Sequence, residues 1–263
     1  MMGNFDFTII TIKHEGIDKD YEFYGSYYRG MLGRNLKKRF CILKNTTCEV
    51  CPLVDKCLYM LSFEKYKDTL FLPYVINRST KNELRITLLG TFSKFSKMYL
   101  EAFTRDLKVK QAGFYNPFLD TIQEEEFILN SNQFKNIENK RNFTLNIEFG
   151  RFKRDSKILN CQEIDFDDIV KAIERRIYLT NKFYGKTQDE IYIHSEFKAT
   201  KIDCTFHNIA RYSNRKKKLM SIPCTNLKFH IENSKDLYRY IYLASILNIG
   251  TNASMGFGQV HVH

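Results

Sequence analysis

The sequence predicts an α+β protein of two similar domains, each with the element order βαββαβ. Apolar residues alternate between the two-residue period of strands and the helical period of about 3.6 residues, and the order of elements repeats after a polar stretch near the middle of the chain. The length of 263 residues suits two such units, and 43% hydrophobic with 27% charged residues can bury a core. Disordered and fibrous classes are therefore excluded.

The first half supplies the first unit. A strand is expected at Phe5–Ile12, and two more at Leu70–Ile76 and Leu84–Leu89. Between them a helix is expected at about residues 25–40, because apolar side chains recur at every fourth position: Tyr24, Tyr28, Leu32, Leu36 and Phe40. The other face of this helix is cationic. A second helix carries Phe92–Phe103, and extended segments continue to about Leu129.

The polar stretch Asn130–Asn142 is the expected boundary, which gives domains of residues 1–135 and 136–263. The second unit begins with a strand at Phe143–Phe149 and a helix opened by Asp165. Strands at Ile191–Phe206 and Leu227–Ile231, an amphipathic helix from Leu237 to Leu247 and a closing strand at Phe257–Val262 complete it. Each unit is thus a split βαβ, or ferredoxin-like (RRM-like), domain: a four-stranded sheet backed by two helices.

Charge points to an anionic partner. Forty-one Lys and Arg against thirty Asp and Glu leave a net charge of +11, which favours a polyanion or an anionic membrane surface. No apolar run approaches the roughly 20 residues of a membrane-spanning helix, so membrane insertion is not expected. The first residues lack a basic segment and a small-residue cleavage site, and a cytoplasmic location is the default expectation.

Four of the seven cysteines form a cluster. Cys41, Cys48, Cys51 and Cys57 could close a tetrahedral site, and we expect this insertion at residues 41–57 to hold a structural zinc that staples a polar loop. An iron–sulfur cluster or four reduced structural thiols are the alternatives. The single cysteines are expected to be small core residues rather than disulfide partners; they are Cys161, Cys204 and Cys224.

Two further segments carry possible anion-binding chemistry. The basic segment 211–218, RYSNRKKK, places five cations among hydrogen-bond donors and a tyrosine that can stack on a base, although such a run is also typical of a solvated loop. The glycine-rich loop 250–258 could bring backbone amides close to an anion, although glycines at a helix-to-strand junction often serve only the turn. The loop lacks the strand-before, helix-after order of nucleotide-binding loops, so ATP or NAD binding is not expected.

Taken in order, these segments resemble a known family. The motif YRGMLG at residues 28–33, the run CEVCPLVDKCLYMLSFE, the RYSNRKKK segment and the C-terminal SMGFG are similar to the CRISPR-associated endoribonucleases that process precursor repeat RNA, the family numbered six in the Cas series, within the RAMP superfamily. The resemblance covers most of the chain.

The resemblance implies that the chain binds CRISPR repeat RNA and cuts the precursor transcript without a catalytic metal to make guide RNA. A ribose 2′-hydroxyl attacks the adjacent phosphate, leaving a 2′,3′-cyclic phosphate and a 5′-hydroxyl. The residues expected to contact RNA come from the basic segment and the glycine-rich loop: Arg211, Tyr212, Ser213, Arg215, Lys216, Lys217, Asn252, Ser254, Gly256 and Gly258.

The expected catalytic residues depart from the usual pattern of the family. Many relatives have a catalytic histidine on the first helix, where this chain has Arg29, which stays protonated and so cannot act as a general base. Arg29 could instead stabilise the transition state, with Tyr27 or Tyr28 as a proton partner, and His14 and His207 are the other candidates. A single histidine on a strand is more often a structural hydrogen-bonding residue.

Two alternatives follow from these departures. The absent helix histidine favours a non-catalytic RAMP subunit that binds guide RNA as a scaffold in a CRISPR effector complex. The cysteines and the charge alone would also suit a zinc-stapled DNA-binding regulator. Cleavage of repeat RNA in EDTA separates the enzyme from the scaffold, and a preference for duplex DNA would favour the regulator.

Overall fold

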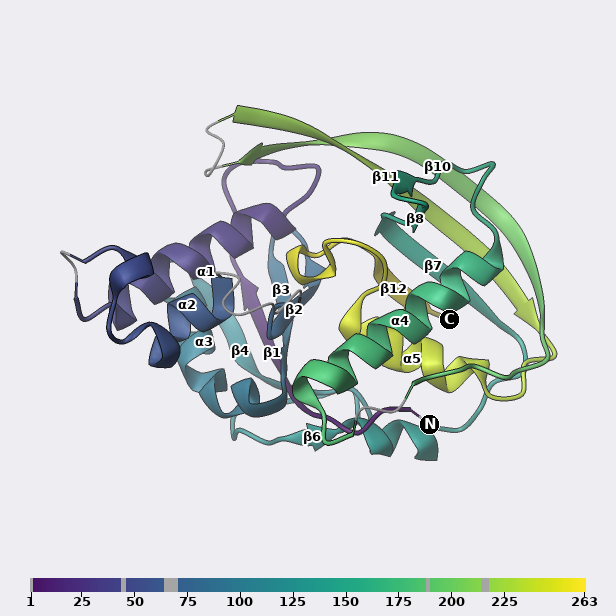
Figure 1. The fold of residues 1–263 in the computed structure, drawn as a ribbon, viewed down its shortest axis with the longest axis horizontal. Helices are drawn as coiled ribbons and strands as arrows, with labels where there is room; N and C mark the ends of the chain where they lie inside the picture. Colours follow the sequence, from purple (N-terminus) through teal and green to yellow (C-terminus); the bar gives the residue numbers. More distant parts are fainter. Residues whose placement is uncertain (1, 44–45, 64–70, 188–189, 214–217) are drawn as a thin grey trace.

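Two antiparallel sheets form the frame of the molecule (Figure 1). The computed structural model describes residues 2–43, 46–63, 71–187, 190–213 and 218–263. The first half contains β1 (Asp6–His14), α1 (Gly25–Phe40), α2 (Leu58–Phe63), β2 (Tyr74–Ser79), β3 (Glu83–Leu89), α3 (Ser96–Thr104), β4 (Val109–Asn116), β5 (Thr121–Gln123) and β6 (Leu129–Asn130). The second half contains β7 (Phe143–Gly150), β8 (Lys153–Arg154), β9 (Lys157–Ile158), α4 (Phe166–Tyr184), β10 (Lys198–Ser213), β11 (Lys218–Glu232), α5 (Leu237–Leu247) and β12 (Gln259–Val262).

The strand order is the same in both halves. The first sheet runs β2-β3-β1-β4-β5, with β6 also paired to β1, and the second runs β10-β11-β7-β12. In each sheet the first strand of the unit lies between its third and fourth strands, and the neighbouring strands are antiparallel. This is the order of a split βαβ unit, so the predicted α+β fold of tandem ferredoxin-like domains is confirmed.

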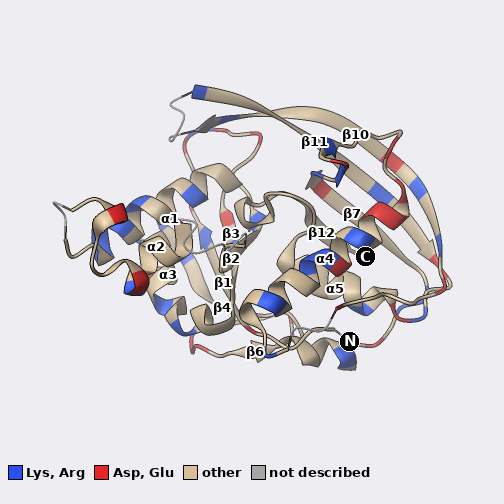
Figure 2. Cartoon of the chain, in the orientation of Figure 1, with Lys and Arg blue, Asp and Glu red and all other residues tan. Residues whose placement is uncertain are grey.

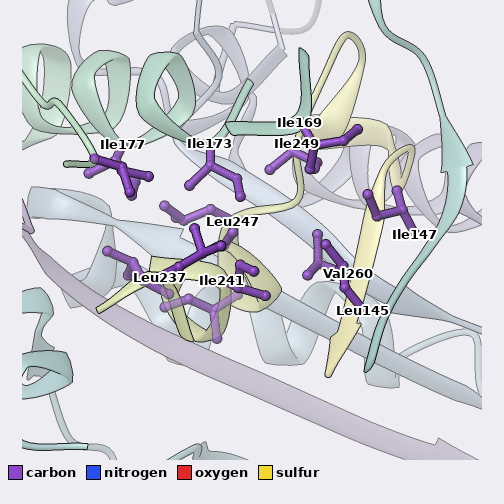
Figure 3. Close-up of a cluster of buried hydrophobic side chains, with 14 of the residues drawn as sticks. Leu145, Ile147, Ile169, Ile173, Ile177, Leu237, Ile241, Leu247, Ile249 and Val260 are labelled. Carbon is purple, nitrogen blue, oxygen red and sulfur yellow. The ribbon is translucent and has the colours of Figure 1, made fainter. Parts of the chain in front are cut away.

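Alternation along β1 explains how the two halves pack. Ile10 and Ile12 join a core formed with α1 and α3, whereas Phe7 and Ile9 join a core that includes the second half of the chain. Figure 3 shows part of that second core, where residues of α4 and α5 meet those of β7 and β12. Successive side chains of a strand point to opposite faces, so one strand serves two cores.

Helix α4 illustrates why the predicted helices form. Asp165 caps its first turn by accepting a hydrogen bond from the Asp168 N–H at 3.0 Å, and the Asp165 N–H donates back to the Asp168 carboxylate at 3.1 Å. Ile169, Ile173 and Ile177 then recur on one buried face. The reciprocal cap and the apolar stripe together fix the start and the orientation of the helix.

The largest departure from the expected elements is the hairpin β10–β11. The expected strands end at Phe206 and begin at Leu227, but the structure pairs Ser213 with Lys218 and Lys198 with Glu232. The first residues of the basic segment are thus part of a strand instead of a loop. Figure 1 shows the free end of this hairpin extending past the second sheet towards α1.

The expectation for two of the single cysteines is wrong. Cys161 and Cys204 form a disulfide, although 43 residues separate them, whereas Cys224 is buried as expected. The chain before α4 folds back against β10, where the Lys201 ammonium donates to the Cys161 carbonyl at 2.9 Å. Only the tertiary fold brings these two thiols together, and nothing in the sequence around either cysteine indicates the pairing.

Within the described ranges, no helix has the length and apolar character that crossing a membrane requires.

Candidate functional site

Helix α1 meets the glycine-rich loop at its first residue. A Cβ at Gly25 would lie 2.0 Å from the Met255 carbonyl oxygen, so only glycine allows this approach. The loop itself bends sharply: Gly258 has a φ of 66°, and a Cβ there would lie 1.9 Å from the Ile249 carbonyl oxygen. The two glycines hold the start of α1 and the loop between α5 and β12 in one fixed arrangement.

The hairpin β10–β11 completes this junction. Phe23, Ile209 and Phe257 share a small buried cluster with Ile222 and Cys224. Because that cluster joins the segment before α1, the hairpin and the glycine-rich loop, it fixes β10 against the first domain. Residues of both domains therefore line one junction.

Three arginines converge there, and we refer to Arg29, Arg151 and Arg211 as the arginine cluster. Arg29 lies on α1, Arg151 follows β7 and Arg211 lies near the end of β10. Burial lowers the pKa of Arg211, and the positive charges of Arg29 and Arg151 lower it further. Arg29 and Arg151 thus both lie close enough to Arg211 for their positive charges to repel its guanidinium group.

The contacts of the cluster do not neutralise it. Arg29 lies 5.1 Å from the centroid of the Phe63 ring, the Arg151 Nε donates to the Pro223 carbonyl at 3.0 Å, and an Arg211 amino group lies 3.3 Å from the Met255 sulfur. In the part of the chain that the structure describes, none of the three arginines pairs with a carboxylate, and the Nε atoms of Arg29 and Arg211 are buried without a partner. The unpaired charge suits an anion that binds from outside.

His14 and Tyr28 lie in a closed hydrogen-bond chain. The Tyr28 hydroxyl donates to the Thr80 carbonyl at 2.7 Å and lies 2.8 Å from His14 Nε2, while His14 Nδ1 accepts from the Gly16 N–H at 3.2 Å. These partners require a neutral His14 that carries its proton on Nε2. Burial lowers the pKa of His14 and raises that of Tyr28, and their hydrogen bonds tie β1, α1 and the β2–β3 turn together.

His207 is placed differently. It lies on the same face of β10 as Ile209 and Arg211, because residues two and four apart along a strand share a face. Its Nε2 is 3.4 Å from the Cys224 sulfur, and the electrostatic influence of Arg151 reaches that thiol. His207 is half-buried, and its position on β10 places it on the same side of the hairpin as Arg211.

The other residues expected to contact RNA divide into four groups. Gly256 and Gly258 are buried, and their N–H groups donate to the carbonyls of Ala253 and Phe149 at 3.0 Å, so they shape the loop and do not present amides to an anion. Asn252 is exposed and Ser254 half-buried. Tyr212 and Ser213 end β10 in backbone pairing. Arg215, Lys216 and Lys217 lie outside the described residues.

The cysteine insertion follows α1. Cys41 caps the helix, and the thiols of Cys41, Cys48, Cys51 and Cys57 are free and half-buried. Burial raises the pKa of Cys48, and the neighbouring Cys57 and Cys41 add to the rise. The donor types suit zinc, but among the described residues no three Cys, His, Asp or Glu side chains are arranged to hold a metal ion.

Sequence reasoning missed Arg151. It belongs to no motif, and it stands in the short segment between β7 and β8. Figure 2 shows that lysines and arginines also line α1 and α4, so charge density alone does not distinguish this position. Its role follows only from the tertiary junction.

Comparisons with known proteins identify solved structures that share this fold. A family model described as AF_1859_N, N-terminal domain, matches residues 11–135, and no curated protein matches the chain. Thermus thermophilus Cas6 (TTHB231) is 12% identical with a TM-score of 0.59, over 99% of this chain and 98% of that one. Product complexes of Cas6 (TTHB231) and of Cas6 (TTHA0078) are 14% and 10% identical, with TM-scores of 0.52 and 0.50, over 98% of this chain and 99% of each of those. The chain therefore has the Cas6 fold over nearly its whole length, which confirms the resemblance at the level of the fold.

Proposed function

We propose that this chain, which has the Cas6 fold, binds CRISPR repeat RNA across the arginine cluster and cleaves the precursor transcript. The observation that carries the proposal is the meeting of three unpaired arginines from both domains at one junction. Two of the Cas6 structures with the same fold are titled product complexes, which supports an RNA ligand for this chain as well. Guanidinium groups bind phosphate oxygens in bidentate fashion, and an RNA backbone supplies such groups in series.

In the proposed reaction the RNA supplies its own nucleophile, and the protein forms no covalent bond to it. The ribose 2′-oxygen loses its proton and bonds to the adjacent phosphorus, the bond from phosphorus to the 5′-oxygen breaks, and that oxygen gains a proton. Arg29 and Arg211 would hold the phosphate and stabilise the charge that develops on its oxygens. His207, which lies on the face of β10 that carries Arg211, is our candidate for one of the two proton transfers.

A non-catalytic RNA-binding subunit is the second candidate. The specific observation that favours it is the enclosure of His14 and Tyr28, since both side chains are buried and their polar atoms are hydrogen-bonded within the fold. Such a subunit would use the same arginine cluster to hold guide RNA in an effector complex, without turnover.

One assay separates the two candidates. The purified chain is incubated with repeat RNA in EDTA, and we expect a single cut per repeat that leaves a 2′,3′-cyclic phosphate. His207→Ala should slow cleavage by about a hundredfold or more without loss of binding. His230→Ala is the matched control, since His230 lies on the neighbouring strand β11, and it should cleave at the wild-type rate. RNA that stays bound and uncut by the wild-type chain would establish the scaffold instead.

We also propose that the cysteine insertion binds a structural zinc, with an iron–sulfur cluster as the alternative. Zinc would require the thiols of Cys41, Cys48, Cys51 and Cys57 to draw together, and it would act by stabilising the loop. Metal analysis of the purified chain should find about one zinc per chain, which Cys51→Ser removes, whereas Cys224→Ser retains it. Equal metal content in the wild-type chain and Cys51→Ser would contradict the proposal.

A further inference from the structure

A cavity of about 590 Å³ lies beside α4, away from the residues assigned above except Arg151. It is open to solvent on one side and lined by α4, the segment after β7 and the start of the glycine-rich loop. Its ionisable lining is mainly cationic: Arg151, Lys153, Arg154, Lys171, Arg175 and Arg176. The one acidic residue among the described lining residues, Asp168, is paired with Arg154 at 2.6 Å. The cavity therefore carries a large positive charge with little internal compensation.

Arg176 distinguishes this cavity from a merely basic surface. The side chain is 8% exposed, its Nε donates to the Leu247 carbonyl at 2.8 Å, and its guanidinium lies 4.0 Å from the centroid of the Phe71 ring. Within the described ranges it has no carboxylate partner. A buried cation without a counter-ion is costly unless an anion neutralises it, so Arg176 points to a negatively charged ligand in the cavity.

Arg151 connects the cavity to the arginine cluster. The Thr251 N–H donates to the Arg151 carbonyl at 2.9 Å, and a Cβ at Gly250 would lie 2.6 Å from that oxygen. The glycine-rich loop thus turns directly over the backbone of a residue that lines the cavity and also influences Arg211. An RNA backbone bound at the arginine cluster could therefore continue into the cavity and stay in contact with cationic residues along this path.

We propose that this cavity binds a phosphate group of the RNA strand that continues beyond the arginine cluster. The inference rests on the proposed function, since it extends the RNA path from the cluster to α4. The volume is that of a site for a small ligand, which is enough for one nucleotide unit. A free nucleotide offers the same phosphate chemistry, but the connection through Arg151 favours a strand.

The test uses two exposed cavity residues, so that folding is not at risk. Arg175→Gln and Lys171→Gln remove one charge each from the cavity, and Lys182→Gln removes one from the same helix outside it. Affinity is measured for repeat RNA with its flanking nucleotides, for the same RNA shortened stepwise from each end, and for AMP. We expect each cavity variant to bind the long RNA about tenfold more weakly than the wild-type chain does. For the shortest RNA to which the wild-type chain still binds, we expect the variants and the wild-type chain to have the same affinity. Lys182→Gln should bind both RNAs as the wild-type chain does.

Each other outcome has a defined meaning. The proposal would be overturned if the cavity variants lost the same affinity for the long and the short RNA, or if Lys182→Gln lost as much affinity as they do. Either result would mean that the lower net positive charge of the protein, and not the cavity, causes the weaker binding. Unchanged affinity in both cavity variants would overturn it as well. Binding of AMP that these substitutions abolish, with RNA affinity unchanged, would assign the cavity to a free nucleotide. A wild-type chain that binds no RNA would overturn the proposed function itself, and this appears before any variant is compared.

Discussion

Arg211→Gln is expected to weaken the binding of repeat RNA by about tenfold to a hundredfold. A hydrogen bond to a charged group contributes about 1.5–3 kcal/mol, and the Arg211 guanidinium has no carboxylate among the described residues to which it is already committed. Arg29→Gln should act in the same direction. For single-stranded RNA, the slope of log affinity against log salt should fall by about 0.7 for each phosphate that the variant no longer neutralises.

The same substitution should not cost stability. Burial and the charges of Arg29 and Arg151 oppose the charged form of Arg211, so its removal relieves repulsion in the RNA-free protein. The melting temperature of Arg211→Gln should therefore equal or exceed that of the wild-type chain, most clearly at low salt. Lys228→Gln, an exposed cation on the same hairpin, is the matched control and should change neither affinity nor stability. If Lys228→Gln loses as much RNA affinity as Arg211→Gln, the junction of the two domains is not the binding site.

The sequence predicts the framework because each element has its own periodic signal. The four-residue spacing of Tyr28, Leu32 and Leu36 gives the buried face of α1, and the run of Phe, Thr and Ile in β1 predicts a strand, which the structure buries on both sides. Such signals are local, so a single sequence is enough to detect them. The strand order of the sheets then follows from the repeated element order.

The hairpin shows where local signals end. Beyond Phe206, strand β10 continues through polar and charged residues, and β11 contains Pro223, which usually argues against a strand. What holds this extension is remote: Ile209 and Ile222 pack against Phe23 and Phe257 from other parts of the chain. No pattern within residues 207–226 reports those partners.

The cationic sites were predicted only in part for a similar reason. Arg211 was found because it belongs to a dense basic run, but Arg151 and Arg176 stand alone in sequence. One signal was present for Arg176: it falls three residues after Ile173, on the face of α4 that is buried. A cation on an apolar face has to be neutralised or hydrogen-bonded, so it indicates a candidate anion site as much as a charged cluster does.

Gly25→Ala is expected to destabilise the junction strongly. The added Cβ would lie 2.0 Å from the Met255 carbonyl oxygen and 2.7 Å from a ring carbon of Phe23. The loop cannot easily retreat, because the Asn248 amide donates to the Ile76 carbonyl at 2.9 Å and Gly258 is packed against Ile249. We expect a loss of about 2–4 kcal/mol in the free energy of unfolding, measured by denaturant titration.

Gly33→Ala on the same helix is the matched control. There the added Cβ would meet only the edge of the Phe63 ring at 3.0 Å, and a side chain can yield where a backbone carbonyl cannot. Alanine also favours helix over glycine by about 1 kcal/mol, so the free energy of unfolding of this variant should stay within about 1 kcal/mol of the wild-type value.

The RNA affinity of Gly25→Ala should fall together with its stability. Arg211 contacts the Met255 sulfur, so any Gly25→Ala protein that still folds must displace the loop that Arg211 touches. A Gly25→Ala protein with wild-type stability and wild-type RNA affinity would mean that α1 and the glycine-rich loop do not meet as described, and the arginine cluster would lose its structural basis.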